Sequence, residues 1–502
     1  MLPPVPVSST GTAKPVAVLP VASTGTAKPV AKPAGAGVHF RREGSSLDGP
    51  SRSVPALWMN AMRKDEDKPM TMRSILTVLL AGTTCLLLAG CQANDEVIPE
   101  TTFRSLLKLA AADAADNNSF GLAVAVDGAY ALVGAPGEDG AGTNSGAVYL
   151  FLQSQGGLDG WGQVRKLIAS DAAAEDIFGV SVDISGDYAV VGAGAEDGSG
   201  SSRGAAYIFY RNQGGVDLWG QVKKLTVTDA ADNDGFGFSV ALDGDTLIVG
   251  ADGVNGGGND EGAAYIFYRN QGGTDNWGQI GKLAAGDPDD INQFGYSVDV
   301  SGDVVIVGSP GENGAGSKRG AAYLFSRGIG GADGWGQLKK LTAGDASDEV
   351  WFGTSTALDG ALAIIGAGWD DGGGTNRGAA YLFDRDQGGA ENWGQLKKLT
   401  ASDARDSDLF GYAVAVDGDY IVVGAGWSKG GGTERGQAYI FSRNEGGADN
   451  WSEAQILRAS DAANEDWFGF SVAIDGLYIL SGASGEDGAG TERGAAYIFR
   501  KI

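Results

Sequence analysis

The chain has 502 residues, of which 84 are glycine, and its net charge is −26. Residues 1–102 hold 10 basic and 8 acidic residues, so the following 400 carry 27 basic and 55 acidic residues, a balance that argues against nucleic-acid binding. The only histidine, His39, and the only cysteines, Cys85 and Cys91, precede residue 92, which excludes a histidine-dependent triad, a cysteine nucleophile and His/Cys-bound zinc from the rest of the chain.

Residues 1–71 are low in complexity, and the stretch STGTAKPVA occurs at 9–17 and again at 23–31. Proline, alanine, valine and threonine dominate up to about residue 37, so there is little to bury and disorder is expected. A targeting signal normally begins a chain, and one follows at residue 72. We therefore expect residues 1–71 to be a disordered leader or an untranslated stretch, with translation starting at Met62, Met70 or Met72.

Residues 72–91 read MRSILTVLLAGTTCLLLAGC, in which Arg73 precedes a mostly apolar run that ends in Leu-Ala-Gly-Cys. This stretch resembles a bacterial lipoprotein signal with its lipobox. The resemblance implies that residues 72–90 are a signal peptide, that Cys91 is the lipidated first residue of the mature protein, and that Gln92 in second place favours the outer membrane. The alternative is a membrane-spanning helix, for which the 17 residues 74–90 are at the lower limit of ~30 Å of hydrocarbon. Residues 91–102 then form a polar tether.

From residue 103 the chain repeats with a period of 58 residues. The period is marked by Phe-Gly pairs that begin at Phe120, Phe178, Phe236, Phe294, Phe352, Phe410 and Phe468. Each unit carries four strand signals, illustrated by FGYAVAV, DYIVVGA, AAYIF and WGQVKKL, and the first two are joined at an Asp-Gly or Ser-Gly pair such as Asp417-Gly418. Seven units of four antiparallel strands predict an all-β, seven-bladed β-propeller over residues 103–502.

The last unit stops after its third strand, and the missing fourth strand is found at the other end of the repeat region. Residues 103–109, FRSLLKL, lie 58 residues before WGQVRKL at 161–167. We therefore expect this N-terminal strand to complete blade 7 and close the ring, whereas an open solenoid would need atypical capping repeats.

The Phe-Gly pair followed by Val-Gly-Ala-Pro, as at 133–136, resembles the FG-GAP repeat of integrin α-subunit propellers, and more closely its bacterial forms. The resemblance implies a propeller that binds a ligand on one loop face. Many integrin-type repeats also carry a long calcium loop between the first two strands. Here that connection is a two-residue turn, and calcium needs six to eight oxygen ligands, so we expect no metal and no other cofactor.

Two sets of periodic residues are interpreted as structural. An aspartate stands seven residues before each Phe-Gly pair, and we expect it to accept backbone N–H bonds in the link between blades rather than to bind cations. A tryptophan at the start of strand four is expected to pack between blades.

Candidate binding residues are those that break the symmetry. Trp369 and Trp427 occupy one loop position of blades 5 and 6 where other blades have glycine or alanine, and Trp351 and Trp467 precede the Phe-Gly pairs of blades 5 and 7. Strand direction places both loop types on one face, and buried aromatic residues are enriched at binding hot spots. The alternative is that these tryptophans pack against neighbouring loops.

These features predict a non-enzymatic binding or adhesion module of the bacterial cell envelope, anchored only through lipid, that presents the loop face to a protein or glycan. One alternative is a carboxylate-based glycan-active enzyme, against which stand the missing histidine, the absence of a distinct carboxylate pair and the absence of the sialidase box S-x-D-x-G-x-T-W. A second alternative is a structural protein of envelope assembly.

Overall fold

The computed structural model describes residues 102–155, 160–255, 260–287, 292–331 and 334–502. The leader at 1–71, the signal peptide at 72–90, Cys91 and the tether up to residue 101 lie outside these residues. All regular structure within them is β-strand, and none of the described segments is a helix long and apolar enough to cross a membrane.

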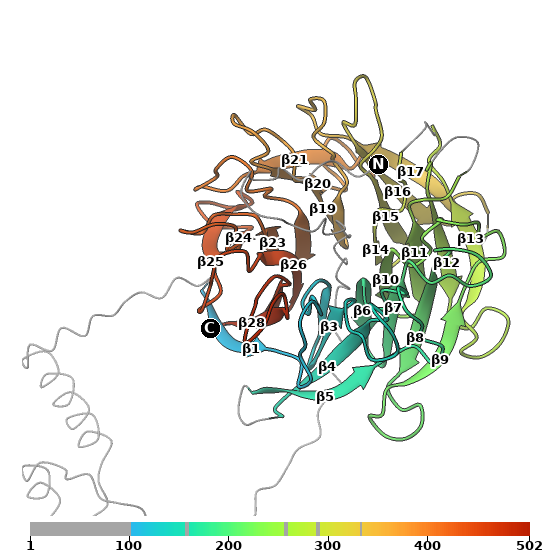
Figure 1. The fold of residues 1–502 in the computed structure, drawn as a ribbon. Coiled ribbons are helices and arrows are strands. Elements are labelled where there is room, and N and C mark those ends of the chain that lie inside the picture. The colour runs from blue at the N-terminus through green and yellow to red at the C-terminus, as the bar shows by residue number, and fades with distance from the viewer. Residues whose placement is uncertain (1–101, 156–159, 256–259, 288–291, 332–333) are drawn as a thin grey trace, which may run out of the picture. The chain divides into compact units, whose positions relative to one another are not determined.

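Within the described residues, twenty-eight strands form seven separate four-stranded antiparallel sheets, which are the blades of a propeller ring (Figure 1). Blade 1 contains β2 (Val124–Asp127), β3 (Tyr130–Ala135), β4 (Ala147–Gln153) and β5 (Trp161–Leu167), and blade 2 contains β6 (Ser181–Ser185), β7 (Tyr188–Ala193), β8 (Ala205–Tyr210) and β9 (Gly220–Leu225). Blade 3 contains β10 (Ser239–Asp243), β11 (Thr246–Ala251), β12 (Ala263–Tyr268) and β13 (Gly278–Leu283), and blade 4 contains β14 (Ser297–Ser301), β15 (Val304–Ser309), β16 (Ala321–Arg327) and β17 (Trp335–Leu341). Blade 5 contains β18 (Ser355–Asp359), β19 (Leu362–Ala367), β20 (Ala379–Asp384) and β21 (Gly394–Leu399), and blade 6 contains β22 (Ala413–Asp417), β23 (Tyr420–Ala425), β24 (Gln437–Ser442) and β25 (Ser452–Leu457). Blade 7 contains β26 (Phe468–Asp475), β27 (Tyr478–Ala483), β28 (Ala495–Lys501) and β1 (Phe103–Leu109).

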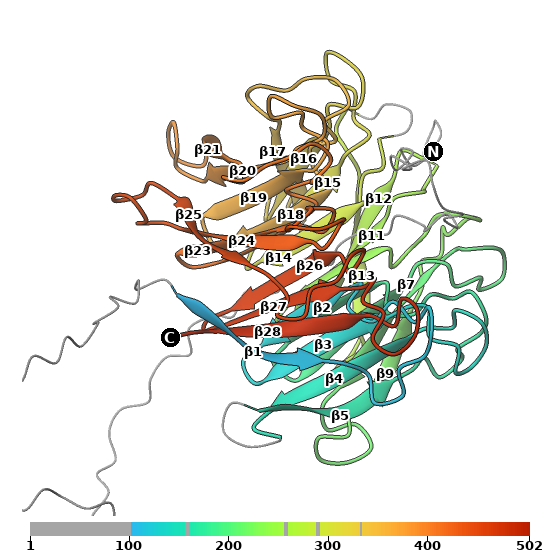
Figure 2. The same cartoon turned by 60° about the vertical axis from the view of Figure 1, so that its left-hand side comes forward.

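The first and last parts of the repeat region share blade 7, as the sequence predicts. Strand β1 pairs antiparallel with β28, from Phe103 opposite Lys501 to Leu109 opposite Ala496 (Figure 2). The side chain of Lys108 adds ion pairs of 2.7 Å to Asp461 and to Glu486. The ring is therefore closed by hydrogen bonds between the two ends of the propeller.

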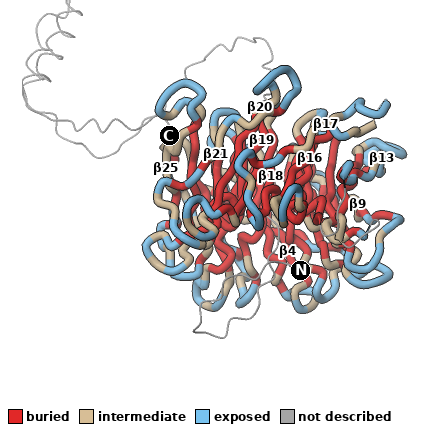
Figure 3. The backbone as a smooth tube through the Cα atoms, turned by 90° about the horizontal axis from the view of Figure 1, so that it is seen from above, coloured by how far each residue is buried: buried red, intermediate tan, exposed pale blue. Residues whose placement is uncertain are grey.

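Burial follows the radial order of the strands within a blade. First strands of neighbouring blades contact one another, so the first strand of each blade is innermost. All six residues of β3 are buried, whereas β5, the outermost strand of the same blade, is buried only at its two ends. A strand covered by neighbouring blades on both faces reads as a continuous apolar run, which explains sequences such as YALVGA. Figure 3 shows the strands mostly buried and the loops at the two ends of the blades mostly exposed.

The hairpin between the first two strands differs in one detail from the predicted joint at Asp417-Gly418. Asp417 still pairs with Tyr420, so it belongs to β22, and the two loop residues are Gly418 and Asp419. Gly418 has φ +56°, the conformation that a type II′ turn requires at its first loop position and that glycine adopts without strain. The aspartate thereby keeps its side chain on the innermost strand.

Candidate binding face

Loops between second and third strands and links between blades meet at the same end of the propeller; this end is called the loop face below. The Phe-Gly pair of each blade bridges to the glycine before the third strand of the preceding blade, as Phe410 does to Gly378. The backbone N–H of Trp351 in one link donates to the carbonyl of Lys318 in the preceding blade's loop at 3.1 Å. The sequence prediction that both loop types share one face is therefore confirmed.

A continuous chain of aromatic rings crosses the loop face of blades 5 to 7. Trp351 lies 5.5 Å from Trp369, Trp369 lies 6.0 Å from Tyr412, and Tyr412 lies 4.7 Å from Trp427, between ring centroids. Phe470 then contacts Trp427 at 5.5 Å and Tyr412 at 5.1 Å. These five residues are called the aromatic arc. Separations and tilts of this kind are those that aromatic pairs favour.

Exposure divides the tryptophans of the arc. Trp351 is only 3% exposed, and the ammonium of Lys318 lies 4.7 Å from its ring centroid. Trp369 and Trp427 are partly exposed and pack against a buried cluster that contains Tyr412 and Phe470. Trp351 is therefore a buried member of the arc, and Trp369 and Trp427 supply the surface of the arc that solvent can reach.

Trp467 is held by different contacts from the other three tryptophans. Its indole Nε1 donates to the carboxylate of Glu434 in the loop of blade 6 at 3.2 Å. Its ring lies against Gly485, where an added Cβ would come within 2.9 Å of the indole. Trp467 is partly exposed and joins blades 6 and 7 at the edge of the same buried cluster.

Sequence analysis missed Tyr412 and Phe470, which connect the arc. Both occupy the position directly after the Phe-Gly pair, at the entry to the innermost strand. The other blades place Leu122, Val180, Phe238, Tyr296 and Thr354 there. The high variability of this position, between an invariant Phe-Gly and a regular strand, was the signal that could have identified it.

The periodic aspartates accept hydrogen bonds from side chains in addition to the backbone bonds that the sequence predicted. In blade 1 the carboxylate of Asp113 accepts from Lys166 Nζ at 2.6 Å and from the Tyr149 hydroxyl at 2.8 Å, rather than from backbone N–H groups alone. Lys166 also bonds to Glu138 of the loop at 2.8 Å. Burial opposes ionisation, yet the lysine and the tyrosine hold the pKa of Asp113 below its usual value.

The same cluster recurs around the loop face with two exceptions. Blade 3 has Val254 in place of the loop acid, so Lys282 pairs with Asp229 at 2.7 Å. Blade 6 has Ile456 in place of the lysine, and Asp403 bonds to Tyr439 at 2.7 Å. These carboxylates are committed to the contacts that hold the links in place. In the part of the chain that the structure describes, no group of three or more His, Cys, Asp or Glu side chains is arranged to hold a metal ion.

The periodic tryptophans of strand four pack between blades, as predicted. Trp219 of blade 2 contacts Tyr130 of blade 1 edge-to-face at 5.3 Å, and Trp277 of blade 3 contacts Tyr188 of blade 2 at 5.5 Å.

The sequence was also compared with known proteins. A search of curated proteins found no match. The FG-GAP repeat family matches seven times, at residues 103–151, 161–209, 219–267, 277–325, 335–383, 393–441 and 451–499. Each match begins at, or one residue before, a fourth strand and ends in the third strand of the following blade, so the matched unit crosses a blade boundary. Seven matched repeats in a closed ring of seven blades show that the chain belongs to the FG-GAP repeat family.

Proposed function

We propose that this protein is a non-enzymatic binding module of the bacterial cell envelope, which uses the aromatic arc to hold a protein or glycan ligand. An FG-GAP propeller fits a binding or adhesion-type module, but one fold hosts many functions, so the proposal depends on the site. The observation that carries it is the aromatic arc, because its Trp369 and Trp427 stand at a loop position where the other five blades have only glycine or alanine.

The partly exposed Trp369 and Trp427 suit contact with a ligand on physical grounds. Both rings rest on buried neighbours, so little side-chain freedom is lost when a partner covers them. Tryptophan is also the residue most enriched at binding hot spots. The flat indole faces fit either an apolar protein side chain or the apolar face of a sugar ring.

Anchoring is proposed from the sequence alone. Cys91 in Leu-Ala-Gly-Cys would carry the acyl chains, and each buried methylene contributes ~0.8 kcal/mol to membrane affinity. The segment between Cys91 and β1 would tether the propeller to the outer membrane or the cell surface. Metabolic labelling with a palmitate analogue tests this directly, because a Cys91→Ser variant should lose the label completely.

Binding is tested by capture of envelope proteins and glycans on immobilised full-length protein. We expect the double variant Trp369→Ala, Trp427→Ala to lose the captured ligand. The matched control is Leu218→Ala, which removes an exposed apolar residue at the opposite end of the propeller and should leave capture unchanged. Undiminished capture by the tryptophan variant would refute the site.

A screen of glycans for cleavage separates binding from catalysis. Turnover that survives the tryptophan substitutions and is abolished by replacing a carboxylate would show a glycan-active enzyme instead. Capture of many copies of one envelope protein in fixed proportion would indicate a structural assembly role.

A further inference from the structure

The described chain begins at the end of the propeller opposite to the loop face. The first strand of each blade runs from its Phe-Gly pair on the loop face to the hairpin, so the hairpins lie at the other end, called the hairpin end below. Strand β1 is the fourth strand of blade 7 and starts at this end, with Phe103 opposite Lys501. The carbonyl of Thr102 accepts the backbone N–H of Ile502 at 3.1 Å. Thr102 therefore lies at the hairpin end of blade 7.

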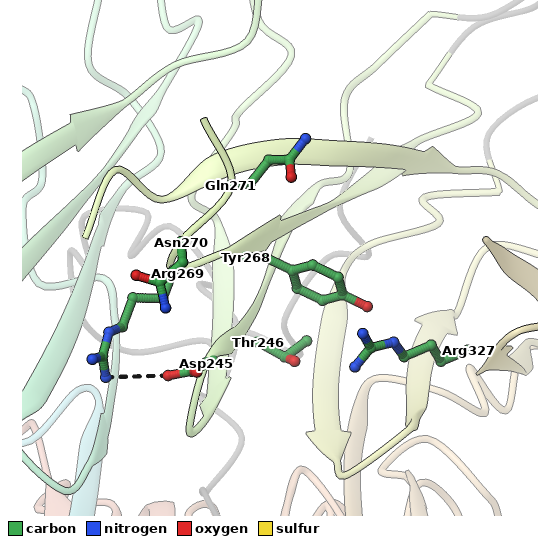
Figure 4. Close-up of a pocket in the computed structure, with 7 residues that line it drawn as sticks. All are labelled: Asp245, Thr246, Tyr268, Arg269, Asn270, Gln271 and Arg327. Carbon is green, nitrogen blue, oxygen red and sulfur yellow. Dashed lines mark ion pairs between the residues drawn. The ribbon is translucent and has the colours of Figure 1, made fainter. Parts of the chain in front are cut away.

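Most blades carry an ion pair at the hairpin end. In blade 3 the carboxylate of Asp245 in the hairpin pairs with the guanidinium of Arg269 at 3.1 Å, and Asn270 follows Arg269 in the chain (Figure 4). Three further blades keep an aspartate and an arginine paired at the same two positions, namely Asp187 with Arg211, Asp303 with Arg327, and Asp419 with Arg443. Blades 1 and 5 have alanine in the hairpin position.

Blade 7 replaces these polar residues by apolar ones. Its hairpin residue is Leu477, which is 49% exposed, and its equivalent of Asn270 is Ile502, which is 48% exposed. The other blades have aspartate or alanine at the first position and serine, asparagine, glycine or aspartate at the second. Lys501 connects the two residues, because it precedes Ile502 and its backbone N–H donates to the carbonyl of Leu477 at 2.8 Å. Its ammonium bonds to the hydroxyl of Tyr420 instead of a hairpin acid.

Two arginines accompany the apolar pair. Arg104 of β1 lies opposite Arg500 of β28 in the strand register; Arg104 is exposed and Arg500 is half-buried. The other blades have glycine or serine at the position of Arg104 and no cation at the position of Arg500. The hairpin acid that blade 7 keeps, Asp475, is buried and accepts the backbone N–H of Gly128. The residues Arg104, Leu477, Arg500 and Ile502 are called the blade 7 patch.

We propose that the blade 7 patch rests on the surface of a lipid bilayer, so that the aromatic arc points away from the membrane. This inference rests on the anchoring proposed above at Cys91. The 11 residue steps from Cys91 to Thr102 span at most about 40 Å. An acylated chain would therefore hold the hairpin end of blade 7 close to the bilayer, where contacts too weak to bind a free protein suffice.

The chemistry of the patch fits a lipid surface. Leu477 and Ile502 would leave water at the boundary between headgroups and acyl chains, and Arg104 and Arg500 would reach lipid phosphates. The 400 residues from Phe103 onward carry 27 basic and 55 acidic residues, so most of the propeller is repelled by phosphates. Blade 7 reduces this repulsion at its hairpin end, because leucine stands where four blades have aspartate and arginine stands where the others have no cation.

The test uses the full-length protein, purified in its acylated form and reconstituted into vesicles of phosphatidylethanolamine and phosphatidylglycerol. Cys91 would carry the lipid and no cysteine follows it, so Ile502→Cys provides a single thiol for an environment-sensitive fluorophore. Lipids with a doxyl group on an acyl chain quench a fluorophore that contacts the bilayer. We expect them to quench the label at residue 502 but not a label on Ile168→Cys, which is 51% exposed in the link that leads to the Phe-Gly pair of blade 2.

A variant taken from the protein's own repeats locates the contact. Leu477→Asp installs the hairpin residue of blades 2, 3, 4 and 6 and should weaken the quenching of the label at residue 502. The matched control, Ala361→Asp, makes the same change in the hairpin of blade 5 and should leave the quenching unchanged. Undiminished quenching in the Leu477→Asp protein would refute the patch.

Flotation of the vesicles separates docking from anchoring. If the protein floats with the vesicles and the label at residue 502 is quenched no more than the label at residue 168, the anchoring stands and the docking is refuted. Protein that does not float would refute the anchoring and the docking with it. Stronger quenching at residue 168 would show that the loop face is turned toward the membrane.

Discussion

The carboxylate of Asp417 in blade 6 accepts the backbone N–H of Gly476 in blade 7 at 2.6 Å. The equivalent bond recurs at every boundary between blades, so that each hairpin turn is tied to the next one around the ring. The donors and acceptors are Gly128 to Asp475, Gly186 to Asp127, Gly244 to Ser185, Gly302 to Asp243, Gly360 to Ser301, Gly418 to Asp359, and Gly476 to Asp417. The aspartate of the hairpin is therefore an inter-blade acceptor.

Burial of the carboxylates among these acceptors makes the stability of the fold depend on pH. Burial raises the pKa of Asp475 from 3.8 to about 6, and repulsion from Asp127 and Asp417 adds to the effect. The folded state thus holds this proton more tightly than the unfolded state. Protonated Asp475 therefore stabilises the folded state, and this contribution to the free energy of unfolding is complete below about pH 4. The contribution is lost as pH rises to about 6 and is absent above that.

The matched variant for this prediction is Asp475→Ser, because Ser185 and Ser301 accept the same N–H bond without charge. We expect the free energy of unfolding of the wild type to fall between pH 4 and pH 7 by up to about 3 kcal/mol more than that of the variant. Urea unfolding at pH 4, 5, 6 and 7 measures both. Parallel pH profiles for the two proteins would contradict a raised pKa at Asp475.

Two glycines of blade 6 should respond to substitution for different reasons. A Cβ on Gly424 would lie 2.0 Å from the carbonyl oxygen of Gly469, so Gly424→Ala must push blades 6 and 7 apart, at a cost of about 3 kcal/mol or more. A Cβ on Gly418 meets nothing within 4 Å, and only its φ of +56° opposes a side chain. Gly418→Ala should therefore cost about 1–2 kcal/mol.

Gly418→Asn provides the control for backbone conformation, since asparagine tolerates this region of φ better than alanine does. Thermal unfolding of the three variants should rank Gly418→Asn above Gly418→Ala and both above Gly424→Ala. A Gly424→Ala variant as stable as Gly418→Ala would mean that the blades are not in close contact at this carbonyl.

The fold could be predicted from the sequence because its signals are local and repeated. The Phe-Gly period counts the blades, the glycine of each hairpin marks a turn, and FRSLLKL at 103–109 matches the strand that the last repeat lacks. The partners of Asp417 and Asp113 could not be predicted, because they lie on another blade or on a distant strand of the same blade.

Phe103 occupies, at the fourth strand of blade 7, the position that tryptophan has in the other six blades, and we expect it to stabilise the fold in the same way. It is 2% exposed, packs against Tyr420, and lies on the strand that closes the ring. Phe103→Ala should lower the free energy of unfolding by about 3–5 kcal/mol. Phe103→Trp installs the residue of the other blades and should be tolerated. Equal stability of the alanine variant and the wild type in urea would show that β1 does not secure the closure.

The aromatic arc predicts a separation between stability and binding within one set of tryptophans. Trp351 is buried, so Trp351→Ala leaves a cavity and should cost about 3–5 kcal/mol of stability. Trp369 is partly exposed, so Trp369→Ala should cost less stability and more ligand, because a hot-spot residue contributes about 2 kcal/mol or more to binding.

Urea unfolding and ligand capture on the same protein preparations measure the two effects. Trp351→Phe is the control that keeps the ring contact with Trp369, and it should recover most of the stability that Trp351→Ala loses. If Trp369→Ala lost as much stability as Trp351→Ala and captured ligand normally, Trp369 would be a packing residue. The arc would then be part of the propeller's core rather than a surface for a partner.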